Sequence, residues 1–329
     1  MNNKMLYKKL EGKSLLITGA NGMIASELVD RLIEINRKEQ LNIHIYALCR
    51  NADRAKKRFE KAVSNGELDL IIQDVIEPLT CNIDFSYIIH AASMAYPFAM
   101  TNQPVDIMKA NFIGTLNMLE YARKCTKCRL LLVSSSEVYG DNIKYDILHE
   151  DTLGEVEFMN PRACYPESKR ASETLCHSYI KQYGCDAVIV RPSFIYGKNI
   201  VDDNTRADVY FLRQGMKKED IVMFSEGTQV REYCYVKDCV DAIIVALLNG
   251  QNGETYNISN NDCAITIRGF AEAIAKHAGI KVVIDESVKP QNTNYLGARL
   301  IKLDTSKIQA LGWMPRYDID MGLTDIFGR

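Results

Sequence analysis

The chain has 329 residues, of which 47% are hydrophobic and 25% charged, as is ordinary for a globular enzyme. The 40 lysines and arginines nearly balance the 42 acidic residues, so we expect no nucleic-acid partner. Residues 1–13 are polar and lysine-rich, unlike a signal peptide, and apolar runs such as 242–248 are too short to cross a bilayer. We therefore expect a cytoplasmic protein with no membrane partner.

Up to Pro192, short apolar runs alternate with helical patterns. We predict strands over Ser14–Thr18, Ile43–Cys49, Leu68–Gln73, Tyr87–His90, Leu130–Ser134 and Ala187–Arg191. We predict helices between them over Met23–Arg37, Val105–Cys125 and Glu167–Tyr183. This alternation predicts an α/β fold, a Rossmann-type doubly wound parallel sheet with helices on both faces.

The pattern changes after residue 192. Residues 193–231 look irregular, and the remainder suggests two helices and one strand, over Asp238–Leu248, Arg268–Ala278 and Thr255–Ile258.

This change predicts two parts of the chain. We expect residues 1–192 to form a dinucleotide-binding domain, to which residues 232–260 return. Residues 193–329 would form a smaller C-terminal substrate-binding lobe. Ligands of open α/β sheets bind outside the carboxyl ends of the strands, so we expect the site between the two parts.

The sequence also contains ten cysteines, and without a secretion signal we expect them to be thiols. Cys125 and Cys128 form a lone CxxC motif, which could be a redox pair or half of a zinc site. No second CxxC or histidine pair lies nearby, so we predict no metal site.

Directly after the first predicted strand, residues 18–25 read TGANGMIA and open the first helix. Glycines permit a tight turn and a close backbone approach, and a helix N-terminus offers free amides to a pyrophosphate. The alternative is an ordinary glycine turn between a strand and a helix. We predict dinucleotide binding at Gly19, Asn21, Gly22, Met23 and Ile24.

The ends of the next strands also carry candidate cofactor contacts. Arg50 follows the second strand where an acidic residue would hold the ribose of NAD, which favours NADP over NAD, unless this arginine is simply a surface cation. Asp74 and Val75 are placed for the adenine. After the fourth strand, small residues line the cofactor's path: Ala91, Ala92 and Ser93.

Two Tyr-x-x-x-Lys pairs are candidates for the chemistry. Tyr165 and Lys169 begin a helix, where a spacing of four places both side chains on one face. Tyr233 and Lys237 lie in a strand-like run, where this spacing has no such meaning. A tyrosine whose pKa is lowered by an ammonium and by the positive nicotinamide ring can accept a hydroxyl proton as a hydride leaves. Ser135, after the fifth strand, can hold the substrate oxygen.

These motifs resemble the extended short-chain dehydrogenase/reductases that act on nucleotide sugars, the NAD-dependent epimerases and dehydratases. The resemblance covers nearly the whole chain and includes the runs 111–117, 134–140, 231–238 and 311–315. It implies that Ser135, Tyr165 and Lys169 form the catalytic triad and that Lys169 touches the nicotinamide ribose. It further implies cofactor contact for Asn111, substrate contact for Ser93, Tyr96, Ser193 and Arg231, and a homodimer.

Within that family, the runs 90–93, 113–119, 160–165 and 169–176 resemble the UDP-glucuronate decarboxylases, as does Ser136-Glu137. A carboxylate at Glu137 suggests chemistry at the neighbouring sugar carbon, unless it only caps a helix or forms an ion pair. The sequence departs from that group at Phe194, at Lys198-Asn199, at Cys49-Arg50 and in the loop that contains Tyr96 and Met100.

We therefore predict an enzyme that uses NAD or NADP to oxidise C4 of a nucleotide sugar. The C4 ketone would labilise the substituent at C5, and loss of carbon dioxide would make the enzyme a UDP-glucuronate decarboxylase. The alternatives on the same scaffold are a 4-epimerase, a 4,6-dehydratase and a 4-oxidoreductase. An alternative of another class is a dinucleotide sensor without catalysis.

Overall fold

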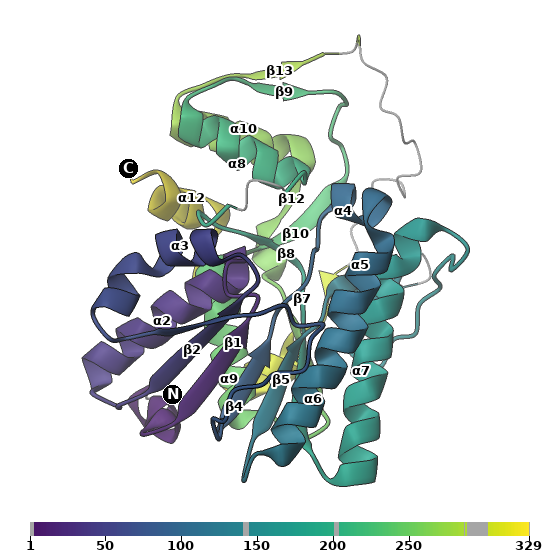
Figure 1. Cartoon of the computed structure of the whole chain (residues 1–329). Helices are drawn as coiled ribbons and strands as arrows, with labels where there is room; N and C mark the ends of the chain where they lie inside the picture. The colour runs from purple at the N-terminus through teal and green to yellow at the C-terminus, as the bar shows by residue number, and fades with distance from the viewer. Residues whose placement is uncertain (1–2, 141–144, 201–203, 286, 288–301, 329) are drawn as a thin grey trace.

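The computed structural model describes residues 3–140, 145–200, 204–285, 287 and 302–328, and its central element is a parallel sheet (Figure 1). The sheet has seven strands in the order β3-β2-β1-β4-β5-β7-β11, and each pair of neighbours runs parallel. The strands are β1 (Ser14–Thr18), β2 (His44–Cys49), β3 (Asp69–Ile72), β4 (Tyr87–His90), β5 (Arg129–Val133), β7 (Asp186–Pro192) and β11 (Thr255–Ile258). This order confirms the predicted doubly wound α/β fold.

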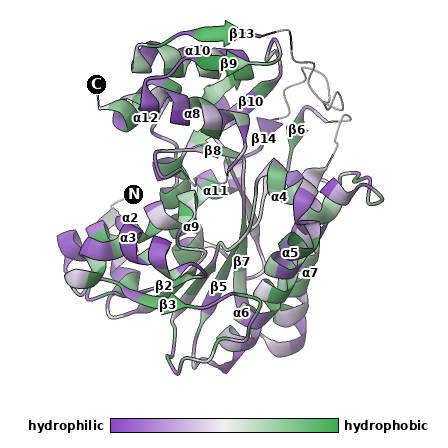
Figure 2. Ribbon diagram, turned by 45° about the horizontal axis from the view of Figure 1, so that its top comes forward, coloured by the Kyte–Doolittle hydropathy of each residue, from purple (hydrophilic) through white to green (hydrophobic). Residues whose placement is uncertain are grey.

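Helices cover both faces of this sheet. One face packs against α2 (Met23–Glu39) and α9 (Val236–Asn249), and the other packs against α6 (Gly114–Lys124) and α7 (Cys164–Tyr183). Strands covered on both faces need apolar side chains on both, which is why β1 is a continuous run whose Leu15, Leu16 and Ile17 are fully buried. Figure 2 shows the resulting apolar character of the sheet.

The remaining helices are short or peripheral. They are α1 (Asn3–Tyr7), α3 (Ala52–Ser64), α4 (Pro97–Asn102), α5 (Pro104–Met108), α8 (Ala207–Lys217), α10 (Ile267–Ala278), α11 (Ser306–Ala310) and α12 (Ile319–Phe327). No helix in the described part of the chain is long and apolar enough to cross a membrane.

A second group of elements lies above the carboxyl ends of the central strands (Figure 1). It contains a three-stranded sheet of β8 (Phe194–Tyr196), β10 (Val230–Tyr235) and β12 (Ala264–Thr266). Two strand pairs accompany it: β9 (Ile221–Met223) with β13 (Val282–Ile284), and β6 (Ile147–Leu148) with β14 (Lys302–Leu303).

The expectation that residues 193–231 are irregular is wrong. That stretch contains β8, α8, β9 and the first two residues of β10. The apolar face of α8 was missed because it is narrow, although its Val209, Phe211 and Leu212 are buried. All ten cysteines are free thiols, as expected.

The single helix predicted over 105–125 is interrupted. Between α5 and α6 the chain forms a π-helical turn over Lys109–Ile113. The carbonyl of Asn111 in this turn accepts hydrogen bonds from Thr115 Oγ1 (2.5 Å) and from Ser172 Oγ on α7 (2.9 Å). Wide turns of this kind occur frequently at functional sites, and here one aims Asn111 at α7.

Candidate active site

The turn after β1 and the loop after β4 meet at the carboxyl edge of the sheet. Gly19 has a φ of 65°, and a Cβ at this position would lie 2.6 Å from Ala92 Cα. Only glycine can therefore occupy the turn. Gly22 is the N-cap of α2, whose first residues are Met23 and Ile24, so the free amides of the helix open at this edge.

A buried pair behind this turn fixes the β4 loop. Thr18 Oγ1 accepts hydrogen bonds from the backbone amides of Ala91 and Ala92, each at 3.2 Å. With both lone pairs used, its hydroxyl donates to His90 Nδ1 at 2.8 Å, which leaves the hydrogen of the imidazole on Nε2. Burial, and secondarily the charge of Lys169, lowers the pKa of His90 to about 3, so this ring is neutral.

The same edge holds polar atoms without a protein partner. Buried polar atoms in proteins are nearly always hydrogen-bonded. Six buried side-chain atoms in this region have no partner: Asn21 Oδ1, Ser93 Oγ, Asn111 Oδ1, Ser134 Oγ, Ser193 Oγ and Arg231 Nε. Four of these residues lie one to three positions after the ends of β1, β4, β5 and β7: Asn21, Ser93, Ser134 and Ser193. This concentration of unpaired atoms fits a polar ligand laid across the strand ends, as a nicotinamide dinucleotide would be.

The residues expected around the adenosine lie together at the ends of β2 and β3. Arg50 Nη1 and Asp74 Oδ2 form an exposed ion pair at 3.6 Å. Asn21 Nδ2 donates to the carbonyl of Asn51, which caps α3, at 3.3 Å. Val75 is buried against Gly114, where an added Cβ would lie 3.0 Å from Val75 Cγ2.

The structure brings Ser135, Tyr165 and Lys169 together. Lys169 Nζ donates to the carbonyl of Val133 at 2.8 Å, and it lies 6.0 Å from the centre of the Tyr165 ring. Ser135 caps the short 3-10 helix Ser136–Tyr139 and hydrogen-bonds Tyr165. One turn along α7, Ser168 Oγ accepts a hydrogen bond from Asn111 Nδ2 at 2.8 Å, which fixes the helix.

Burial strongly affects the pKa values of Tyr165 and Lys169. Burial lowers the pKa of Lys169 to about 8, although the carboxylate of Glu173 acts in the opposite direction. In the chain without cofactor, the pKa of Tyr165 is raised rather than lowered, first by burial and then by the charge of Glu137. The expected lowering therefore requires positive charge beyond what the chain places there.

Glu137 points into the same region and pairs with a residue to which we assigned no role. Its Oε2 lies 3.6 Å from Arg162 Nη1. The ion pair that we left open as an alternative for Glu137 is thus present. The same Arg162 nitrogen contacts Met100 Sδ at 2.9 Å. We expected Tyr96 and Met100 to lie in a loop. Instead, Met100 is buried in α4, and Tyr96 is the N-cap of this helix.

The residues expected to bind substrate come from both groups of elements: Ser93, Tyr96, Ser135 and Ser193 follow strands of the central sheet, and Arg231 lies on β10. Arg231 stacks 4.2 Å above the Phe194 ring and donates to Gln229 Oε1 at 3.0 Å. The second Tyr-x-x-x-Lys pair is separated, because Tyr233 is buried in β10 while Lys237 opens α9 and pairs with Asp325.

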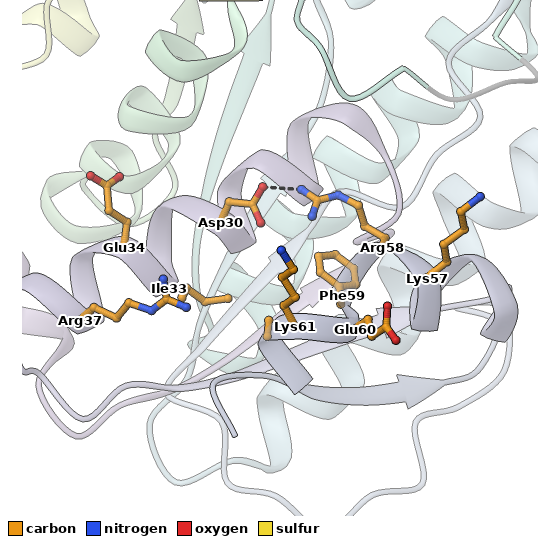
Figure 3. A pocket seen from close by; sticks show the side chains of 10 residues that line it. Asp30, Ile33, Glu34, Arg37, Lys57, Arg58, Phe59, Glu60 and Lys61 are labelled. Carbon is orange, nitrogen blue, oxygen red and sulfur yellow. Dashed lines mark hydrogen bonds and ion pairs between the residues drawn. The ribbon is translucent and has the colours of Figure 1, made fainter. Parts of the chain in front are cut away.

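A surface hollow lies elsewhere, between α2 and α3 (Figure 3). It has a volume of about 500 Å³ and is lined by charged side chains of both signs, among them Asp30 and Arg58, which form an ion pair. None of the residues predicted for catalysis lines it.

The fold and site define an enzyme with a Rossmann fold. The chain matches the model of the NAD dependent epimerase/dehydratase family over residues 15–259. It is 33% identical to UDP-glucuronic acid decarboxylase 1 of Danio rerio over 97% of this chain and 73% of the relative. It is 34% identical to UDP-glucuronic acid decarboxylase 3 of Arabidopsis thaliana over 94% of this chain and 86% of the relative.

Solved structures have the same fold. UDP-glucose 4-epimerase of Thermotoga maritima superposes with a TM-score of 0.79 at 22% identity, over 96% of this chain and 97% of that one. UDP-N-acetylglucosamine 4-epimerase of Methanobrevibacter ruminantium gives 0.81 at 20% identity, over 97% and 98%. The dTDP-glucose 4,6-dehydratase of Bacillus anthracis, solved in complex with NAD, gives 0.77 at 20% identity, over 96% of both chains.

The chain therefore belongs to the NAD dependent epimerase/dehydratase family, and the prediction of an NAD-dependent enzyme of this class is confirmed.

The close approach of Gly19 to the β4 loop gives a test of cofactor binding. Gly19→Ala places a Cβ against Ala92 and should abolish NAD binding, measured by calorimetric titration. Gly66→Ala is the matched control, because Gly66 has a similar φ of 69° but no atom within 4 Å of an added Cβ. It should lower the stability by about 1 kcal/mol and leave NAD affinity unchanged. Equal NAD affinity in both variants would contradict the placement of the dinucleotide at this turn.

Proposed function

We propose that the chain oxidises C4 of a UDP-sugar with a bound nicotinamide cofactor and that its reaction is the decarboxylation of UDP-glucuronate. The observation that carries the proposal is the similarity, over nearly the whole chain, to proteins named UDP-glucuronic acid decarboxylases. The grouping of Ser135, Tyr165 and Lys169 beside Glu137 supports it.

The residues of the site have separable tasks in this proposal. The cofactor would accept the hydride from C4 and return it to C4 after the loss of carbon dioxide, so that a UDP-pentose forms without net consumption of cofactor. Ser135 holds the C4 oxygen, and Tyr165 takes the hydroxyl proton, for which its pKa has to fall through the positive charges of Lys169 and the nicotinamide ring. Asn111 and Ser168 keep the helix of Tyr165 in place. Backbone amides at the start of α2 hold the pyrophosphate.

Glu137 and Arg162 are placed for the step after oxidation. Once C4 is a ketone, the bond to the C5 carboxylate can break, because the ketone takes up its electron pair. The guanidinium of Arg162 can orient that carboxylate. Glu137 can deliver the proton that takes the place of the carboxylate at C5. On the substrate's other side, Ser193 and Arg231 carry unpaired polar atoms suited to the diphosphate, and Ser93 and Tyr96 border the sugar.

Product analysis tests the reaction. We expect purified protein with UDP-glucuronate and NAD to release carbon dioxide and form a UDP-pentose, detected by mass spectrometry. Tyr165→Phe should reduce kcat at least about 100-fold because the proton acceptor is lost. Tyr183→Phe, at the exposed end of the same helix, is the matched control and should retain activity.

Other products would select the alternatives. An unchanged mass with inverted C4 would indicate a 4-epimerase, loss of water a 4,6-dehydratase, and net consumption of cofactor a 4-oxidoreductase. Bound cofactor without turnover of any nucleotide sugar would favour a sensor and contradict the proposal.

We also propose that the enzyme accepts NADP through Arg50. This guanidinium lies at the end of β2, where the 2′-phosphate of NADP would come, and its exposed pair with Asp74 is weak enough to exchange for a phosphate.

Removal of this cation tests the coenzyme choice. Arg50→Ala should weaken NADP binding about tenfold, the loss of one charge-assisted hydrogen bond, and change NAD affinity less than twofold. Calorimetric titration of both coenzymes measures the ratio. An equal effect on NAD and NADP would show that Arg50 does not read the 2′-phosphate.

We propose, as the sequence resemblance implied, a homodimer through the helices that contain Asn111 and Tyr165. The helix α5 leads into the first of them. Three large apolar side chains at intervals of three and four residues are exposed there: Val105 (61%), Met108 (46%) and Phe112 (40%). An exposed apolar strip of this kind is typical of a protein interface. We also propose the domain division at residue 192 and a cytoplasmic location.

Introduction of negative charge into this apolar strip tests the dimer. Met108→Glu combined with Phe112→Glu should convert the protein from dimer to monomer in light scattering coupled to gel filtration. Val63→Glu on α3, which also replaces an exposed apolar residue, should leave the mass unchanged. A wild-type monomer would refute the interface.

A further inference from the structure

A buried ion pair joins α7, the helix of Tyr165 and Lys169, to β7, and the mechanism above does not use it. Glu173 follows Lys169 by one helical turn on α7 and is 6% exposed. Its two carboxylate oxygens accept hydrogen bonds from Arg191 on β7, from Nε at 3.0 Å and from Nη2 at 2.6 Å. This two-pronged geometry fixes both side chains.

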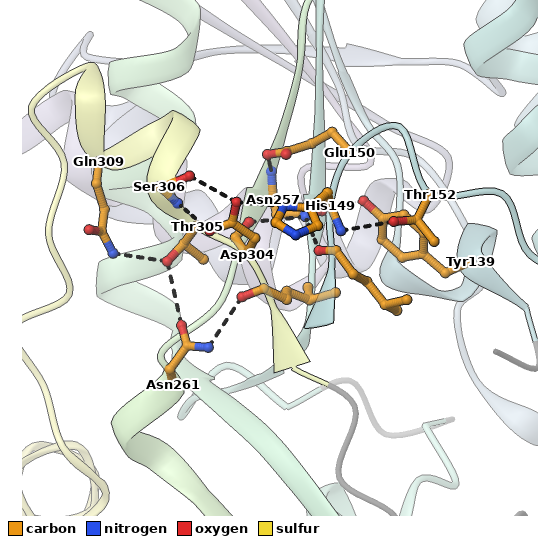
Figure 4. Close-up of polar contacts among 12 residues, drawn as sticks. Tyr139, His149, Glu150, Thr152, Asn257, Asn261, Asp304, Thr305, Ser306 and Gln309 are labelled. Carbon is orange, nitrogen blue, oxygen red and sulfur yellow. Dashed lines mark hydrogen bonds and ion pairs between the residues drawn. The ribbon is translucent and has the colours of Figure 1, made fainter. Parts of the chain in front are cut away.

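Arg191 is itself held by a network that reaches the C-terminal part of the chain. Its Nη1 donates to Tyr139 Oη and to the carbonyl of Glu150, each at 2.8 Å. Tyr139 Oη donates to Asn257 Oδ1 at 2.6 Å, and the fully buried Asn257 donates on to the carbonyls of Leu148 and Asp304 (Figure 4). The guanidinium therefore cannot swing away from Glu173.

The strand register places this pair beside the ammonium of Lys169. Lys169 Nζ is bound to the carbonyl of Val133, and Val133 is the Cα partner of Val190 across β5 and β7. Arg191 is the next residue of β7. Glu173 lies one helical turn from Lys169 and acts on its charge, and Arg191 is held against Glu173 on the neighbouring strand, so a negative and a positive side chain lie on the elements packed around the ammonium.

Other ionisable groups also face this region. Those on the packed elements are His90 from β4, Tyr165 and Cys176 from α7, Tyr139 from the 3-10 helix, and Glu137 beyond Tyr165. His90 is neutral, and burial keeps the two tyrosines and the cysteine protonated, because it raises the pKa of each. Of the permanent charges on these elements, Glu173 acts on Lys169 directly, and Arg191 is held against Glu173.

We propose that Glu173 is a positioning residue for Lys169: its carboxylate keeps the buried lysine an ammonium, and Arg191 holds the carboxylate in place while limiting its effect. Without the carboxylate, burial and the positive Arg191 would both favour the neutral amine. The functional meaning rests on the proposed function, since an ammonium is what makes Tyr165 acidic enough to act. The charge coupling itself does not depend on any substrate.

The two halves of the pair predict opposite changes. The pKa of Lys169 in the wild type is expected at about 8 and can be measured by NMR titration of the lysine ¹³Cε and ¹⁵Nζ signals, assigned by their loss in Lys169→Met. Glu173→Gln removes the negative charge and should lower this pKa by roughly one pH unit. Arg191→Gln removes the positive charge and should raise it by a similar amount.

A structural role would give a different pattern. Arg191→Lys keeps the charge but loses the two-pronged contact, so it should lower the melting temperature while the pKa of Lys169 stays at the wild-type value. If both glutamine variants moved the pKa in the same direction, or left it unchanged while still folded, the proposal would be overturned. If one of them did not fold, the other with the lysine variant would still decide the sign.

Activity provides the second measurement. Where Lys169 must be an ammonium, activity falls as pH rises through its pKa, so the alkaline limb of kcat/KM should move down in Glu173→Gln and up in Arg191→Gln. If the pKa of Lys169 shifted as predicted in both variants but UDP-glucuronate was not turned over, Glu173 would keep this role and only the proposed reaction would be refuted. Turnover with unshifted alkaline limbs would refute the role of Glu173 alone.

Discussion

Burial of both faces of the parallel sheet is the constraint on which the rest of the structure depends. A strand covered by helices on each side can carry few polar groups along its length, so those groups collect where the strands end. The loops after β1, β4, β5 and β7 hold the unpaired polar atoms, and α7 brings its tyrosine and lysine to the same edge. The site thus follows from the layer architecture as much as from any single motif.

The same burial sets the electrostatics of the site. A lysine amine taken out of water prefers to be neutral, and a tyrosine in the same place prefers to keep its proton. Lys169 is compensated by the carbonyl of Val133 on β5 and by a carboxylate on its own helix. For Tyr165, a serine hydroxyl and two arginines favour ionisation, but burial and a nearby glutamate outweigh them. The protein alone prepares half of the acid–base pair, and the positive ring of a bound cofactor is what would complete it.

Much of this arrangement could be predicted from the sequence. The strand β1 and the turn after it are local signals, because a glycine at a positive φ and an apolar run leave direct traces in the residue pattern. The bounds of β4 and β11 also agree with the prediction to the residue.

What could not be predicted depends on contacts between distant segments. The π-helical turn around Asn111 is stabilised by a serine some sixty positions away, and no local periodicity announces it. Arg162 lies in the run 160–165, which indicated only the family resemblance, and its pairing with Glu137 depends on the folding of distant segments. Glu173 and Arg191 are equally invisible, since a carboxylate on a helix is normally read as a solvated residue.

The contact between Gly19 and Ala92 divides the proposed cofactor site into two kinds of surface. At the pyrophosphate, the walls are main chain, so that part depends on backbone shape and on the absence of side chains. Where the adenosine is proposed to bind, the walls are the exposed side chain of Arg50 and the half-buried side chain of Asp74. Evolution can therefore exchange one coenzyme for another by altering a few surface residues, while the grip on the shared part of both coenzymes is inherited unchanged with the fold.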